Sequence, residues 1–106
     1  MERDEIEFTV DVIDGAEGVV VTPHGELDML TEGELRTVLE GQTARGALTL
    51  DLSQLQFLDT PGLRLVLEMA EAARREGFAF TVVPGSPAIQ RLFEIAGVLE
   101  LVPFRS

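Results

Sequence analysis

Asp51-Leu-Ser-Gln-Leu-Gln-Phe-Leu-Asp-Thr-Pro-Gly-Leu63 is the stretch where an apolar, strand-like run passes into a helix. Thr60 stands where a helix N-cap is expected, because its hydroxyl can accept a hydrogen bond from a free backbone N–H group. Pro61 suits the first helical position, where a missing N–H costs little. Apolar residues recur at helical spacing from Leu63 onward. The stretch therefore predicts a strand, a short loop, and a helix with a hydroxyl group at its N-terminus.

The predicted helix is apolar around much of its girth, which indicates packing against both a sheet and a neighbouring helix. Its two apolar stripes comprise Leu63, Val66, Leu67, Ala70 and Ala73, and Leu65, Met69 and Ala72. Gly77 is the predicted C-cap, and residues 78–83 are the next buried strand. A strand, crossover helix and strand make a right-handed unit with parallel strands, in which function usually lies in loops at the carboxyl ends of strands. Asp59 and Thr60 lie in such a loop.

Another helix and another strand are predicted upstream of this unit. Residues 47–52 are rich in apolar side chains, as expected of a strand buried on both faces. Thr31 and Glu34 have the spacing of a capping box, which predicts the start of a helix. That helix is expected to bury Leu35, Val38 and Leu39 and to end at Gly41 or Gly46. Asp28 then lies in the loop before the helix.

The N-terminal part of the chain predicts a β-hairpin. Apolar residues alternate with polar ones at Ile6, Phe8, Val10 and Val12, the period of a strand with one buried face. Residues 14–18 carry a turn signal, and residues 19–21 resume the strand pattern, so we expect the two strands to be antiparallel. Pro23 and Gly25 should limit how far the second strand pairs regularly.

A last helix is predicted from Ser86 and Pro87, which suit the cap and the first helical position. Its apolar face is predicted to consist of Ile89, Leu92, Phe93 and Ala96, and Gly97 is predicted to end it. A short strand is predicted at residues 98–102. The order of elements predicts one α/β domain spanning residues 1–106. We expect a mixed sheet of four to five strands, with helices mainly on one face.

The composition excludes most kinds of catalytic and metal site. The 106 residues include no cysteine and one histidine, which removes thiolate chemistry and any multi-histidine metal site. Asp28 and Asp59 are paired carboxylates, but so acidic a sequence contains many such pairs. Neither a dinucleotide-binding motif nor a phosphate-binding loop is present, and His24 is not assignable to any serine or threonine as a base. We therefore expect no catalysis, no metal and no cofactor.

The charge balance bears on possible partners. Nineteen acidic residues against eight basic ones give a net charge of −11, which repels a nucleic-acid backbone and favours a basic protein partner. No apolar run approaches the length that spans a membrane, and the charged residues 1–5 are unlike a signal peptide. We expect a cytosolic protein that neither binds nucleic acid directly nor inserts into a membrane.

The predicted hydroxyl at the helix start can do one of two things. As a plain N-cap, Thr60 would contribute about 1 kcal/mol to stability, and most helices have such a cap. As a phosphate acceptor, it would place about −1.5 to −2 charges beside Asp59, which changes the surface that a partner meets. The helix dipole would favour that phosphate by about 0.3 to 1 kcal/mol. Local physics alone leaves both interpretations open.

The motif of residues 51–63, together with Gly25-Glu-Leu-Asp28 before a helix that begins with threonine, resembles the STAS domain of bacterial anti-sigma factor antagonists. The likeness covers nearly the whole chain, in element order as well as in motifs. It implies a small cytosolic protein that binds an ATP-dependent anti-sigma factor serine/threonine kinase and so frees a sigma factor. The kinase phosphorylates the residue directly after the motif aspartate, which breaks the complex, and a protein phosphatase resets it.

Carried over by position, the resemblance makes Thr60 the phosphoacceptor. It implies that Asp59 orients the site, that Gly62 lets the partner's nucleotide pocket approach closely, and that Asp28 is a recognition residue. The implied partner-binding residues are Glu26, Asp28, Asp59, Pro61, Gly62 and Leu63. Two residues depart from the commonest form of the motif: Thr60 replaces serine, and Pro61 replaces a small polar residue and removes a backbone donor.

Two other roles are compatible with the same family resemblance. One is an accessory subunit of an ABC transport complex, in which the same surface holds a helix of an ATPase. The other is a component of a multi-protein stress-sensing assembly. Neither alternative requires a phosphorylation switch.

Overall fold

The computed structural model describes residues 7–44 and 46–105. Ile6, which the sequence places in the first strand, lies outside these residues. The elements follow one another in this order: β1 (Thr9–Gly15), β2 (Gly18–Leu27), α1 (Glu32–Glu40), β3 (Ala47–Asp51), β4 (Leu55–Leu58), α2 (Thr60–Glu76), β5 (Phe80–Val83), α3 (Pro87–Ile95) and a 3₁₀ turn (Leu99–Leu101).

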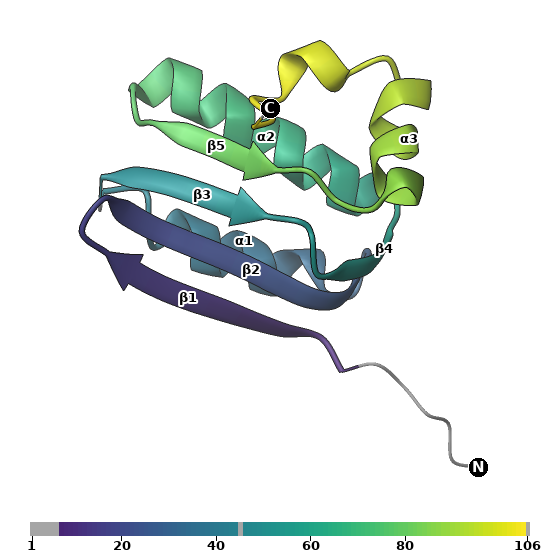
Figure 1. The fold of residues 1–106 in the computed structure, drawn as a ribbon, viewed down its shortest axis with the longest axis horizontal. Helices are drawn as coiled ribbons and strands as arrows, with labels where there is room; N and C mark the ends of the chain where they lie inside the picture. The colour runs from purple at the N-terminus through teal and green to yellow at the C-terminus, as the bar shows by residue number, and fades with distance from the viewer. Residues whose placement is uncertain (1–6, 45, 106) are drawn as a thin grey trace.

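The five strands form one mixed sheet, as predicted. Four of them follow the order β1-β2-β3-β5, with the β1–β2 hairpin antiparallel and the other pairs parallel (Figure 1). The strand β2 is long enough to have two parallel neighbours, because β3 pairs with residues 18–21 and β4 pairs with residues 25–27. The pairing with β4 shifts register between Gly25 and Glu26, which confirms the interruption expected at Gly25. The interruption expected at Pro23 is wrong, because Pro23 pairs with Val10 in regular register.

The strand β4 was not predicted as a separate element. In the sequence only residues 52–54 separate it from β3, and it belongs to the stretch that leads into the next helix, but the chain turns between the two strands. The Asp51 carboxylate accepts a hydrogen bond from Ser53 N at 2.9 Å, and Leu55 N donates to the Leu52 carbonyl at 3.1 Å. The turn moves the chain from the first half of β2 to its second half.

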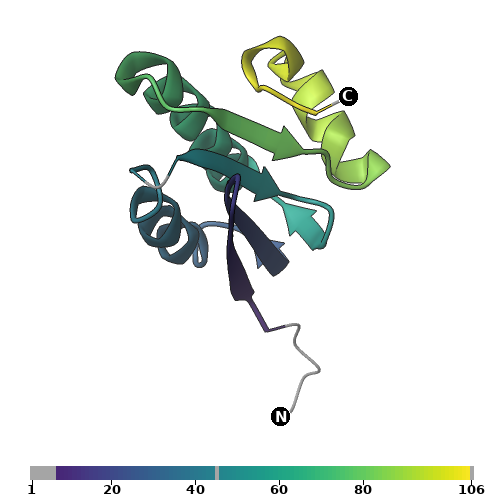
Figure 2. The ribbon, with the colours of Figure 1, turned by 60° about the vertical axis from the view of Figure 1, so that its left-hand side comes forward.

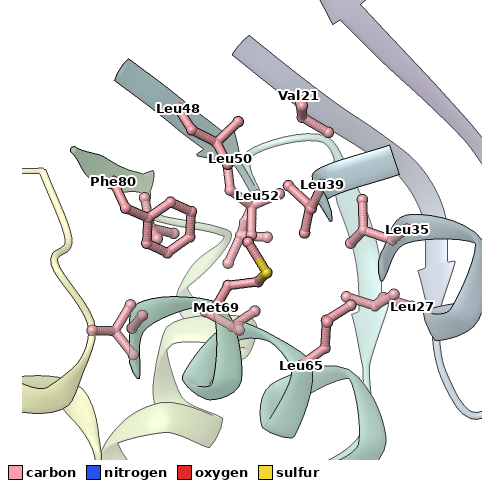
Figure 3. Packing of buried hydrophobic residues seen from close by; sticks show 14 of the residues in the cluster. Val21, Leu27, Leu35, Leu39, Leu48, Leu50, Leu52, Leu65, Met69 and Phe80 are labelled. Atoms are coloured by element: carbon pink, nitrogen blue, oxygen red, sulfur yellow. The ribbon is translucent and has the colours of Figure 1, made fainter. Parts of the chain in front are cut away.

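The helices α1 and α2 lie together on one face of the sheet (Figures 1 and 2), which confirms the predicted arrangement. Between them and the sheet is the core, where leucines of every layer meet around Met69 (Figure 3). Beyond the free edge of β5, Val82 forms an isolated bridge with Phe104. The helix α3 packs there, with the rings of Phe93 and Phe104 5.2 Å apart, edge to face.

The other face of the sheet is less covered than the sequence suggests. In β3, Leu48 and Leu50 are buried, whereas Ala47 is exposed and Thr49 half-buried, so the prediction of a strand buried on both faces is wrong. In β1, Val10 is partly buried, but Val12 and Ile13 are 43% and 64% exposed. In β3 the cause is that α1 and α2 cover only one face of the sheet. Val12 pairs with the buried Val21 and so lies on the covered face, and it is exposed because β1 is the edge strand.

Three of the predicted capping residues are confirmed, whereas the predicted C-terminal strand is not. Ser86 caps α3 by accepting a hydrogen bond from Ile89 N, Gly41 ends α1, and Gly77 ends α2 with the left-handed φ of 81° that favours glycine. Residues 98–102, however, do not form a strand. They contain the 3₁₀ turn, which the Leu101 N–H closes by donating to the Val98 carbonyl.

Candidate functional site

The parallel pairing of β2 with β4 brings two loops together at the carboxyl ends of these strands (Figure 1). Leu27 and Leu58 are paired, so Asp28 and Asp59 each begin the loop that follows. The start of the second loop is bonded to the end of β2, because Asp59 N donates to the Leu27 carbonyl at 3.2 Å. The structure thus places the two conspicuous motifs of the sequence side by side.

Asp59, and not Thr60, is the N-cap of α2. Its backbone is extended, with φ −111° and ψ −174°, and its Oδ1 accepts a hydrogen bond from Gly62 N at 3.1 Å. Thr60 and Pro61 are already in the first turn of the helix. The prediction that Thr60 caps the helix is therefore wrong by one residue. Asp and Thr are both good caps, and here the carboxylate occupies the position.

The Thr60 side chain consequently has no structural task. Thr60 is exposed, and its hydroxyl makes no hydrogen bond with any residue in the described ranges. A hydroxyl that is accessible and unused by the fold can be modified without breaking an internal contact. Its neighbours Asp59 and Pro61 are half-buried, so Thr60 is the most exposed residue of the helix start.

The Asp28 loop is fixed by its own side chains. Asp28 Oδ1 accepts hydrogen bonds from Leu30 N at 3.0 Å and from Thr31 N at 3.2 Å. The Thr31 hydroxyl accepts from Asp28 N at 3.0 Å and donates to the Glu26 carbonyl at 2.8 Å. The predicted capping box is therefore wrong, because Thr31 bonds backward to the loop and its side chain does not cap α1. These hydrogen bonds hold the loop together, along with those that Thr31 N and Glu32 N donate to the Asp28 carbonyl at 3.1 and 2.8 Å.

This fixed loop carries apolar side chains that the sequence analysis did not single out. Met29 and Leu30 are 70% and 86% exposed, and Phe57 on the neighbouring strand β4 is 47% exposed. We call Met29, Leu30 and Phe57 the apolar flank. Two large apolar residues directly after Asp28, outside any helical or strand period, were the signal that could have indicated it.

The other predicted partner-binding residues differ in accessibility. Glu26 is exposed, and Leu63 is half-buried like Pro61. Gly62 is buried, and a Cβ atom there would lie 2.7 Å from Leu58 Cδ1 and 2.8 Å from the Leu27 carbonyl oxygen. The glycine therefore allows α2 to pack closely on the ends of β2 and β4. Its observed contacts are internal.

The ion pairs among the described residues do not include Asp28 or Asp59. Arg36 on α1 bonds to Glu32 at 3.1 Å and to Glu68 on α2 at 2.8 Å. The hydrogen bond to Glu68 is the main cause that raises the pKa of Arg36. His24 pairs with Asp11 at 2.9 Å on the hairpin. Within the described ranges, no three potential metal ligands gather in one place.

A small α/β domain that presents an exposed hydroxyl at a helix start, next to two adjacent strand ends that carry Asp28 and Asp59, has features of a regulatory binding domain. The chain belongs to the STAS domain family, whose profile matches residues 7–106. It is 27% identical over 88 residues to the anti-sigma F factor antagonist of Paenibacillus polymyxa, covering 80% of this chain and 75% of that protein.

Solved structures agree with this family membership. An anti-sigma factor antagonist from Mycobacterium paratuberculosis is 29% identical, with a TM-score of 0.78 over 92% of this chain and 85% of the other. The Bacillus cell fate determinant SpoIIAA, in its phosphorylated form, shares the fold at 21% identity, with a TM-score of 0.67 over 94% of this chain and 92% of the other. These comparisons favour an antagonist over a transport subunit. Among the described helices, none is long and apolar enough to cross a membrane.

Proposed function

We propose that this chain is an anti-sigma factor antagonist whose binding is switched by phosphorylation of Thr60. The observation that carries the proposal is the exposed Thr60 hydroxyl, which the fold does not use. The named relatives support the regulatory role. SpoIIAA, which shares the fold, has been solved in a phosphorylated form.

The proposed partner is an anti-sigma factor that is also a serine/threonine kinase and holds ATP. The Thr60 oxygen attacks the γ-phosphorus, the bond from that phosphorus to the bridging oxygen breaks, and ADP leaves. The hydroxyl proton passes to a base of the kinase. A protein phosphatase returns the site to the free hydroxyl by hydrolysis. Since a sigma factor acts with RNA polymerase, this proposal places the protein in the cytoplasm.

The proposed partner surface consists of both loops and the apolar flank. Asp28 and Asp59 fix the loops in shape before the partner arrives, which reduces the entropy lost on binding. Met29 and Leu30 offer apolar anchors, while Glu26 and the net charge of −11 favour a partner with basic residues around an apolar contact. Gly62 is buried and contributes indirectly, because it lets the start of α2 approach the ends of β2 and β4.

The phosphorylation is tested by incubating the protein with the candidate kinase and ATP and recording intact mass. We expect one added phosphate on the wild-type chain and none on Thr60→Ala. Thr60→Ser is the matched control, because it keeps the hydroxyl and should still accept the phosphate. Equal phosphate uptake by the wild-type chain and Thr60→Ala, or none by either the wild-type chain or Thr60→Ser, would reject Thr60 as the acceptor.

A further inference from the structure

Arg64 lies one helical turn after Thr60 on the outer side of α2. Residues four apart on a helix are neighbours, and both side chains are exposed. Glu68, four residues after Arg64 on α2, is the acidic residue that could pair with it along the helix. Glu68 is already bound to Arg36 at 2.8 Å. Arg64 forms no hydrogen bond or ion pair with another residue of the described chain.

The start of α2 offers few other groups to a phosphate. The Gly62 N–H is bound to the Asp59 carboxylate, and Pro61 has no N–H. The adjacent charge is that of Asp59, which repels a phosphate. A phosphate on Thr60 would therefore be pushed away from its own loop and toward the next turn of the helix, where Arg64 lies.

We propose that Arg64 is the internal partner of a phosphate on Thr60, forming an ion pair along the first two turns of α2. This inference rests on the proposed function, because it takes Thr60 as the acceptor. An acid that precedes a base by four residues has the favourable orientation on a helix, and a guanidinium can bind two phosphate oxygens at once. The pair holds the phosphate on the outer side of α2 and slightly stabilises the phosphorylated chain.

The pair is tested on protein with phosphothreonine incorporated at position 60 during translation, so that no kinase is needed. Three such chains are compared: one with Arg64, one with Arg64→Gln, and one with Arg91→Gln. Arg91 is the matched control, an exposed arginine that lies on α3 and so is not one helical turn from Thr60 along α2. Phosphorus NMR records the titration of each phosphate, and thermal unfolding is recorded for each chain and its unphosphorylated counterpart.

We expect the phosphate to lose its last proton at lower pH in the chain with Arg64 and in Arg91→Gln than in Arg64→Gln. We also compare the change in melting temperature on phosphorylation. This change should be about 1 to 4 °C more positive for the chain with Arg64 than for Arg64→Gln. Identical titrations in all three chains would overturn the role of Arg64. That result would not affect the proposal that Thr60 is the acceptor. Conversely, a kinase that fails to modify Thr60 would reject the acceptor role without testing the pair, which is measured on chains that carry the phosphate from translation.

Discussion

At the scale of single residues, the site divides its tasks between neighbours. Asp59 has a structural task, because its carboxylate caps α2, and Thr60 has none, because its hydroxyl makes no bond within the described chain. A residue that carried both tasks could not be modified without weakening the helix start. The separation allows a phosphate to change the surface while the fold is kept.

This division predicts unequal effects of two adjacent substitutions on stability. Asp59→Ala should lower the free energy of unfolding by about 0.5 to 2 kcal/mol, because the Gly62 N–H loses its acceptor. Thr60→Ala should change it by less than about 0.5 kcal/mol. Thermal and urea unfolding measure both, with Asp59→Asn as the control that keeps a capping oxygen. A larger loss for Thr60→Ala than for Asp59→Ala would show that the hydroxyl is the cap.

The sequence predicted the residues of this site but not their bonds. Asp59-Thr60-Pro61 contains two residues that can cap a helix, and propensity alone does not say which backbone is extended and which is already helical. Likewise, Thr31 and Glu34 have the spacing of a capping box. The Thr31 hydroxyl instead bonds to Asp28 and Glu26, whose proximity is created by the loop.

At the scale of elements, the close contact of α2 with the ends of β2 and β4 positions Thr60. Asp59 N bonds to Leu27, and Gly62 lies against Leu27 and Leu58. The sequence predicted α2 and its end at Gly77 well, because the helical period is long and regular. It did not predict β4, because a four-residue strand that directly follows another apolar run has no distinguishing period.

Gly62→Ala tests this contact. Although alanine favours a helix by about 1 kcal/mol over glycine, a Cβ would be 2.8 Å from the Leu27 carbonyl oxygen. We expect a net loss of about 1 to 3 kcal/mol in the free energy of unfolding, from overpacking. Gly33→Ala in α1 is the control, since no atom lies within 4 Å of its added Cβ, and it should stabilise the protein. Stabilisation by both substitutions would contradict the close contact.

The exposed apolar side chains of the Asp28 loop are expected to contribute to partner binding. Leu30→Ser removes the most exposed side chain of the apolar flank and should weaken partner binding by roughly tenfold, with the melting temperature unchanged. Ile95→Ser on α3 is the control, because Ile95 is 70% exposed but lies on another element. Calorimetric titration with the partner measures both. Equal weakening by the two substitutions, or none by Leu30→Ser, would remove the apolar flank from the proposed surface.

At the scale of the whole molecule, one sheet, two covering helices and a terminal helix at the β5 edge support a small site at one end. The sequence predicted this architecture because hairpin, crossover unit and helix caps each have a local signal. It overestimated burial in β3, where Ala47 and Thr49 lie on the uncovered face, and at Val12 in the edge strand β1, since an apolar pattern is the same whether or not a helix covers it. The apolar flank was missed because its surroundings are set by two strands that are far apart in sequence.

The central claim is that charge on Thr60 changes binding and leaves the fold unchanged. The most direct measurement is the affinity of the kinase partner for the wild-type chain, Thr60→Glu and Thr60→Gln, together with the melting temperature of each. Thr60→Gln matches Thr60→Glu in shape without its charge. We predict that Thr60→Glu weakens binding roughly tenfold relative to Thr60→Gln, with all three melting temperatures within about 4 °C of one another. Equal affinity of the two variants, or unfolding of Thr60→Glu, would contradict the claim.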